Sequence, residues 1–293
     1  MERVGFLRES AGLHLEFLRN DEPKACGNRS LRGVDMARYI RHVCSGCLVV
    51  LGWAASGWAQ NPGLAVLDAV KFREFAAARD LVSRGVAVDA EQPDGATALH
   101  WAAYHDDLAT VTVLIKAGAD LDSQNDYGVT PLALACDNGS AKMVSTLLEA
   151  EADPQKRRSS GETPLMTCAR TGDVDAVNAL LQHGADANIV EPWQGQTALI
   201  WAVGEGHTDV ARTLIAGGAD VNVRSTGGFS ALLIGARQGN PGLARLLIDA
   251  GADVNDQAPD GTSPLLVATV RGHVALAVAL LELGANPNVS DAG

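Results

Sequence analysis

One pattern recurs along the chain at an almost constant spacing. Two landmarks define it: Thr or Ser, then Ala or Pro, then Leu; and, about 20 residues later, Gly-Ala-Asp or a close variant. The first landmark returns after 33, 33, 34, 33 and 33 residues, beginning at Thr97, Thr130, Thr163, Thr197, Ser230 and Ser263. Two landmarks that keep one period over six units indicate a repeat architecture, in which each unit packs only on its neighbours.

A single unit shows how the repeat folds. The Thr197 hydroxyl can accept a hydrogen bond from a free amide at a helix start, and Gly206 is a residue that commonly ends a helix in the left-handed conformation. A second helix is predicted over residues 208–216, again ended by glycine. Neither helix reaches the ~12–15 residues that are marginal for an isolated helix in water, so the units must stack to bury their apolar faces.

These residues resemble the ankyrin repeat. The segment Thr97-Ala-Leu-His-Trp-Ala-Ala103 and the stretch from Gly206-His207 to Asn222 are similar to that family's signature, and the resemblance covers residues 64–293. It implies an all-α solenoid of helix-turn-helix units joined by β-hairpin loops. The chain departs from the family in two ways: the His of the first helix survives only at His100, and Asp106 replaces one helix-ending Gly.

The repeats divide the second part of the chain. Residues 64–92 are predicted to form a degenerate N-terminal capping repeat, residues 93–290 six full repeats, and residues 291–293 the start of another. The last second helix, over residues 274–281, is almost entirely apolar. We therefore expect the natural chain to continue beyond Gly293.

The first part of the chain resembles an export signal. An apolar run over residues 43–59 follows basic residues and ends in small ones. We expect residues 36–59 to be a cleaved signal peptide of an exported bacterial protein, periplasmic or secreted, that starts at Met36. Residues 1–35 would then be a disordered upstream extension, and residues 60–63 a linker. The alternative start is Met1, and the alternative role of the run is an uncleaved anchor that tethers the protein to a membrane.

Four of the five cysteines form two suggestive pairs. Cys44 and Cys47 could be a redox motif or a lipid attachment site, but they lie in the apolar run and are interpreted as part of the signal. Cys136 and Cys168 occupy neighbouring small positions in adjacent repeats. A disulfide needs Cα atoms within ~7 Å, and packed helices lie ~8–10 Å apart, so we expect buried free thiols here.

The net charge of −12 limits the partners. Residues 1–42 hold eight basic and six acidic side chains, so the remainder carries 15 basic against 29 acidic ones. Such a surface repels nucleic acid and anionic membranes and favours a neutral or basic protein. We expect a monomer.

No arrangement of residues indicates catalysis, a cofactor or a metal. The histidines fall in different units and repeat phases, and no zinc-helix, phosphate-loop or nucleophile motif is present in the sequence. The Asp column that recurs once per repeat could be mistaken for a calcium site. Its members are spread along the solenoid, so hydrogen bonding within each turn is the better interpretation.

The resemblance implies that binding residues lie at the hairpin tips and at the solvent-facing ends of the first helices, which together line a concave face. Exposed aromatics with Arg nearby are typical hot spots, although neighbouring hairpins could cover some of them. Trp101 and Trp201, within the helices, are interpreted as packing residues. The candidate partner-binding residues are Tyr104, His105, Tyr127, Arg170, Trp193, Gln194, Glu205, Phe229, Arg237 and Gln238.

Two functions remain open on the sequence. The first is a protein–protein interaction scaffold without chemistry of its own. The second is a targeting module within a longer enzyme or toxin-related chain whose active part would follow Gly293.

Overall fold

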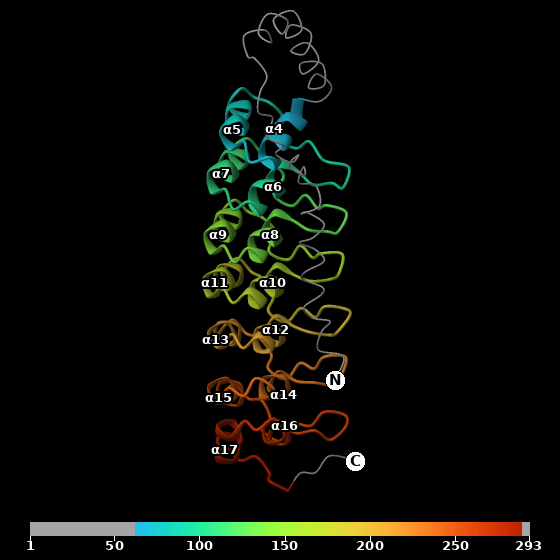
Figure 1. Cartoon of the computed structure of the whole chain (residues 1–293), viewed down its shortest axis with the longest axis vertical. Helices are drawn as coiled ribbons and strands as arrows, with labels where there is room; N and C mark the ends of the chain where they lie inside the picture. The colour runs from blue at the N-terminus through green and yellow to red at the C-terminus, as the bar shows by residue number, and fades with distance from the viewer. Residues whose placement is uncertain (1–61, 289–293) are drawn as a thin grey trace, which may run out of the picture. The chain divides into compact units, whose positions relative to one another are not determined.

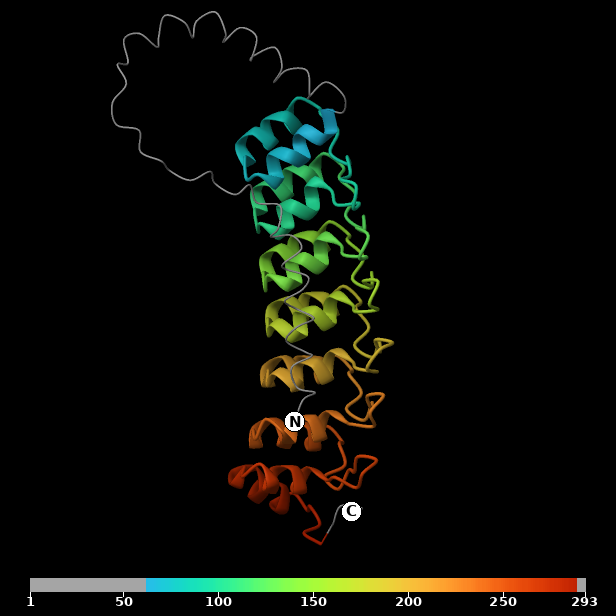
Figure 2. The same cartoon turned by 45° about the vertical axis from the view of Figure 1, so that its right-hand side comes forward.

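The computed structural model describes residues 62–288, which form helices in consecutive pairs stacked in a row (Figures 1 and 2). The first helices of the pairs are α4 (Pro62–Lys71), α6 (Ala98–Tyr104), α8 (Pro131–Asp137), α10 (Pro164–Thr171), α12 (Ala198–Glu205), α14 (Ala231–Ala236) and α16 (Pro264–Val270). The second helices are α5 (Phe75–Ser83), α7 (Leu108–Lys116), α9 (Ala141–Glu149), α11 (Val174–Gln182), α13 (Thr208–Ala216), α15 (Pro241–Asp249) and α17 (Val274–Glu282). The predicted all-α solenoid is therefore confirmed.

The repeated Thr or Ser starts each first helix from α6 onward. Its side-chain oxygen accepts a hydrogen bond from the backbone N–H three residues later in every case. Pro131, Pro164 and Pro264 follow it at the first helical position, where a missing N–H costs nothing. The sequence landmark is thus a helix cap.

The helix ends follow the same logic. Gly206 ends α12 with φ of 80°, a left-handed conformation that costs glycine no steric strain. Asp106, which stands in the place of such a glycine, also has a positive φ of 55°. Asp is among the few other residues that tolerate this region, so the departure leaves the turn intact.

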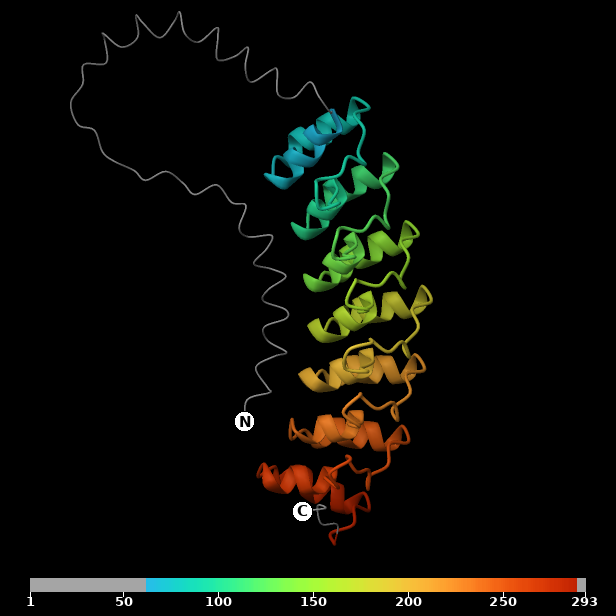
Figure 3. The same cartoon turned by 90° about the vertical axis from the view of Figure 1, so that its right-hand side faces the viewer.

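The core is built between pairs. First helices contact the first helices of the next pair, and second helices contact second helices, in two parallel rows (Figure 1). Figure 3 shows the stacked pairs from the side. The repeated Leu of the landmark is at most 1% exposed at Leu99, Leu132, Leu165, Leu199 and Leu232. Since the helices have only six to ten residues, this shared burial is what makes them stable.

The prediction of free thiols at Cys136 and Cys168 is wrong. The two residues form a disulfide between α8 and α10, and their Cα atoms are 4.6 Å apart. The axes of packed helices lie ~8–10 Å apart, but Cα atoms lie ~2.3 Å from each axis, so Cα atoms that face each other approach to ~3.5–5.5 Å. The cysteines are 32 residues apart, one fewer than the period, which places them opposite one another.

Part of the last described pair remains uncovered. Val274, Val278 and Leu281 on α17 are 71%, 49% and 46% exposed. None of the helices within residues 62–288 is long and apolar enough to cross a membrane. The expectations for residues 1–61, including the signal segment and Cys44-Cys47, and for residues 289–293 concern parts of the chain outside those that the structure describes.

Truncation of a stacked leucine should be costly. Leu199 is completely buried, so Leu199→Ala removes apolar contacts and leaves a cavity that we expect to lower the free energy of unfolding by ~2–5 kcal/mol. Leu281→Ala is the matched control, because that side chain is 46% exposed and should cost ~1 kcal/mol or less. Denaturant titration of both variants measures the difference, and equal losses would contradict the assignment of core and surface.

Acid should weaken the fold through His100. Its Nδ1 accepts the Thr97 N–H at 3.1 Å, and its Nε2 lies 2.9 Å from the Val129 carbonyl oxygen, which fixes a neutral ring. Burial lowers the pKa of His100, although the bond to Val129 opposes this. Below about pH 6.5 the unfolded chain therefore binds a proton at this histidine that the folded chain does not bind. The free energy of unfolding consequently decreases as the pH is lowered, by up to ~1.4 kcal/mol per pH unit for this group.

The control for this effect is His100→Ala, because Ala133 occupies the same position in the next repeat. Burial also lowers the pKa of His105, and that contribution stays in both proteins. Denaturation between pH 7 and pH 5 should show the steeper loss in the wild type. Identical slopes would rule out His100 as the source.

Candidate partner-binding surface

The loops between pairs project to the same side and place their tips in one row, called the tip row here (Figure 1). Backbone hydrogen bonds join several neighbouring tips: Asp126 N–H to Asp94 O at 2.8 Å, Ser159 N–H to Tyr127 O at 2.9 Å, and Thr226 N–H to Gln194 O at 2.7 Å. Because these tips are bonded to one another, their backbones are held in fixed relative positions.

Pro192 occupies the corresponding position in another tip, where it has no N–H to donate. It packs against Gly161 instead: a Cβ on Gly161 would lie 2.2 Å from Pro192 Cδ. Contact with the preceding tip is therefore kept by close packing rather than by a hydrogen bond, and Gly161 permits it because it has no side chain.

Trp193 lies at the one tip that is a residue longer than the others. The carbonyl of Gln194 accepts the bond from the next tip just as that of Tyr127 does, so Trp193 is the additional residue of the 34-residue unit. The Trp193 residue is 76% exposed. The insertion therefore presents an indole to solvent.

A buried carboxylate shapes this tip. Glu191 is only 4% exposed, and its oxygens accept the backbone N–H groups of Trp193 at 2.7 Å, Gln194 at 2.9 Å and Gln196 at 3.0 Å. In a shorter tip, Asn125 does the same with its amide oxygen for Tyr127 and Val129. Glu191 thus holds the backbone on both sides of Trp193.

Two further aromatic side chains lie on the tip row. Tyr127 is 43% exposed and Phe229 is 37% exposed. The Phe229 ring lies over the backbone of Gly227, where an added Cβ would meet the ring at 3.1 Å. The tip row therefore displays aromatics ahead of α8, α12 and α14, and the Trp193 tip is the most exposed of them.

Several predicted helix-end residues bridge neighbouring pairs. His105 lies 3.1 Å from the Lys71 carbonyl through Nε2 and accepts from Arg73 at 3.2 Å through Nδ1, and Tyr104 packs against its ring. The Gln238 amide donates to the Gly204 carbonyl. The polar groups of His105 and Gln238 thus already bond within the protein, and they order the face between one pair and the next.

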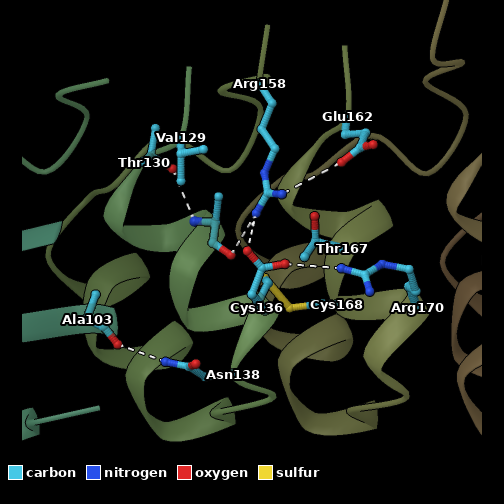
Figure 4. A network of polar contacts seen from close by, with 12 residues as sticks. Ala103, Val129, Thr130, Cys136, Asn138, Arg158, Glu162, Thr167, Cys168 and Arg170 are labelled. Carbon is cyan, nitrogen blue, oxygen red and sulfur yellow. Dashed lines mark hydrogen bonds and ion pairs between the residues drawn. A yellow bond between two sulfur atoms is a disulfide. The ribbon is translucent and has the colours of Figure 1, made fainter. Parts of the chain in front are cut away.

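Arg170 belongs to a network of charges between α8 and α10 (Figure 4). Its guanidinium is 3.1 Å from the Asp137 carboxylate and lies over the ring of Trp201, at 5.8 Å from the centroid. Arg158, whose side chain is 7% exposed, pairs with the same carboxylate and lies 3.8 Å from Glu162. Asp137 thus joins two guanidinium groups that come from the neighbouring repeat.

The remaining predicted residues are exposed. Glu205, Arg237 and Gln194 have solvent-accessible side chains, and within residues 62–288 neither Glu205 nor Arg237 takes part in an ion pair. Trp101 is 7% exposed and lies under the Lys71 ammonium, which confirms its packing role. The structure thus brings the tip residues into one row. Of the helix-end residues, His105, Arg170 and Gln238 bond to the neighbouring repeat, whereas Glu205 and Arg237 are exposed and form no ion pair within the described residues.

The sequence interpretation missed Arg158 and Glu191. Both stand at the hairpin position that Asn125 occupies in another repeat, and a charge at a position suited to a turn-capping Asn was the available signal. The Asp column was interpreted correctly. Asp120, for example, accepts the Asp122 N–H at 3.0 Å, and the other members repeat this turn.

Clusters of three or more His, Cys, Asp or Glu side chains that could hold a metal do not occur in the part of the chain that the structure describes. What the geometry offers is a row of ordered loops with exposed aromatics beside a helical face. This defines a helical repeat scaffold whose loop edge exposes aromatic side chains.

The comparisons with known proteins agree with this class. The model of the family described as Ankyrin repeats (3 copies) matches residues 66–158, 150–225 and 217–291, and the chain belongs to this family. The crystal structure of the human ASB11 ankyrin repeat domain is similar, with a TM-score of 0.66 and 26% sequence identity over 76% of this chain and 98% of that one. No curated protein sequence matches the chain significantly. Ankyrin repeats are generally protein–protein interaction modules.

The Trp193 tip should loosen without its buried carboxylate. In Glu191→Ala, three backbone N–H groups lose a charged acceptor, a contact that contributes ~1.5–3 kcal/mol. We expect hydrogen exchange over residues 191–196 to accelerate about tenfold or more. Glu205→Ala, which removes an exposed carboxylate, is the control. Unchanged exchange in the Glu191 variant would show that the tip is held by its packing on Gly161 alone.

Proposed function

We propose that this protein is a binding scaffold that captures a protein partner on the tip row and the adjoining ends of the first helices, along the concave face. Membership of the ankyrin-repeat family supports the general role, and the display of Tyr127, Trp193 and Phe229 supports the location. The scaffold itself carries out no reaction in this proposal. Its work is to hold the exposed side chains in a fixed pattern.

The exposure of Trp193 on an ordered tip is the observation that carries the proposal. A large aromatic residue that is 76% exposed has much apolar area left to bury, and Trp is enriched among binding hot spots. Because Glu191 and Pro192 already fix the tip backbone, less conformational entropy is lost when a partner covers the indole. An aromatic on a loose loop would lack this second advantage.

Charge narrows the class of partner. The chain carries −12, and its acidic excess lies after residue 42. Arg158 and Arg170 are engaged with Asp137, so they offer little positive charge to a partner. We propose a neutral or basic protein as the partner, bound by a monomeric scaffold, and neither nucleic acid nor an anionic membrane.

The proposed site of action is outside the cytoplasm, in the periplasm or beyond the cell. The signal-like run at residues 43–59 supports export, and the buried disulfide supports it independently, because such bonds persist in oxidising compartments. Tethering by an uncleaved run is the alternative. Amino-terminal sequencing of the exported protein separates the two, since a start near Gln60 excludes the tether.

Loss of the aromatic tips should weaken binding but not folding. The partner is first identified by quantitative capture on wild-type protein and then titrated as a purified protein. For Trp193→Ala combined with Tyr127→Ala, we expect an affinity loss of ~2 kcal/mol or more, about 30-fold, with stability changed by ~0.5 kcal/mol or less per site.

Val278→Ala is the matched control, because it shortens another exposed apolar side chain on α17, away from the tip row (Figure 1). Its affinity should equal that of the wild type. Undiminished affinity of the double tip variant would sink the proposal that the tip row is the binding surface.

A further inference from the structure

The disulfide between Cys136 and Cys168 lies where most of the other repeats have alanine. Ala103 and Ala202 occupy the corresponding positions of α6 and α12, and both cysteines are 0% exposed. The fold therefore does not require cysteine at these places. The pair adds a covalent bond to a contact that alanine suffices to make elsewhere.

The bond lies beside the charge network described above (Figure 4). Asp137 follows Cys136 directly and pairs with Arg158 and Arg170, both of the next repeat. The disulfide and the Arg170–Asp137 ion pair thus join α8 to α10, and the Arg158–Asp137 ion pair joins α8 to the loop that precedes α10. None of the other neighbouring pairs within residues 62–288 is joined by a disulfide.

The two joined repeats are those that separate the most exposed aromatic tips. Tyr127 lies in the loop before α8, and Trp193 lies in the loop after α11. Any opening between α8/α9 and α10/α11 would therefore move one aromatic relative to the other. A cross-link at this interface restricts that movement directly.

We infer that the Cys136–Cys168 disulfide is a permanent staple that makes residues 127–193 one cooperative unit and fixes the spacing of Tyr127 and Trp193 for binding. This rests on the proposed function for its second part only. The oxidised protein presents both tips in one geometry. The reduced protein opens between the two repeats and binds more weakly.

Burial dictates when the bond forms. The two thiols lose two protons and two electrons as the S–S bond forms, and an external disulfide takes these up and becomes two thiols. No external disulfide reaches sulfur atoms that are 0% exposed, so the exchange precedes or accompanies the docking of α8 on α10. By the same argument, reductants cannot reach the bond in the folded protein, which makes it a staple rather than a switch.

Thiol trapping tests the staple. Full-length protein exported through an oxidising compartment is alkylated after four treatments: none, dithiothreitol alone, denaturant alone, or both, and Cys136 and Cys168 are followed by peptide mapping. We expect alkylation of this pair only when reductant and denaturant are combined. Alkylation in denaturant alone would show free thiols, and alkylation by native protein in dithiothreitol would show a reducible switch. Either result overturns the inference.

The variant Cys136→Ala/Cys168→Ala tests the cooperative unit, because alanine is the residue that most of the other repeats carry at these two positions. We expect amide exchange over residues 130–182 to accelerate at least tenfold relative to the oxidised wild type, and exchange in α15 to change much less. Equal exchange rates in both proteins would overturn the inference that the disulfide makes residues 127–193 one cooperative unit.

Titration with the identified partner separates this inference from the proposed function. Weaker binding by both the alanine pair and the Trp193/Tyr127 variant supports both. If only the tip variant binds more weakly, the result supports the tip row as the binding surface and contradicts the inference that the disulfide fixes the spacing of Tyr127 and Trp193 for binding. If the tip variant binds normally, the proposed surface fails, and the trapping and exchange results still decide whether the staple exists.

Discussion

Burial of apolar faces between neighbouring helix pairs is the interaction on which the rest of this structure depends. Helices of six to ten residues are unstable alone, and each pair supplies its neighbours with buried residues such as Leu199. Each repeat therefore contributes both buried residues to the core and exposed residues to the surface. Substitutions on the stacking sides affect at least two repeats, whereas exposed side chains at the loop tips can vary without disturbing the buried contacts between helix pairs.

This division explains where the polar groups at the ends of the first helices are used. Side chains at the helix ends, such as His105 and Gln238, bond to carbonyls of the preceding pair. These bonds fix the twist from one pair to the next, and they also occupy groups that would otherwise be available to a partner. The Trp193 residue at the loop edge, by contrast, is 76% exposed. The most exposed aromatic residue of the proposed binding surface therefore lies at the loop edge.

The period of the sequence was enough to predict most of the fold. The capping Thr or Ser and the glycine ends are local signals, and the helix predicted over residues 208–216 coincides with α13, Thr208–Ala216. The disulfide and the Asp137 network were not predictable by the same means, because they depend on distances between repeats. The axis spacing of packed helices misled the interpretation of Cys136 and Cys168, since Cα atoms facing each other lie much closer than the axes.

Two features of this chain depart from the regular period. A 34-residue spacing adds Trp193 to one tip, where a regular loop would keep its neighbours' length. A 32-residue separation brings Cys136 opposite Cys168, where cysteines one full period apart would occupy the same position in both repeats and be offset from each other. Both deviations leave the stacking leucines in register, because one residue is absorbed in a loop and the other only shifts a side chain along a helix. A repeat fold thus accommodates individual features at places where a single residue can be gained or displaced without disturbing the contacts between pairs.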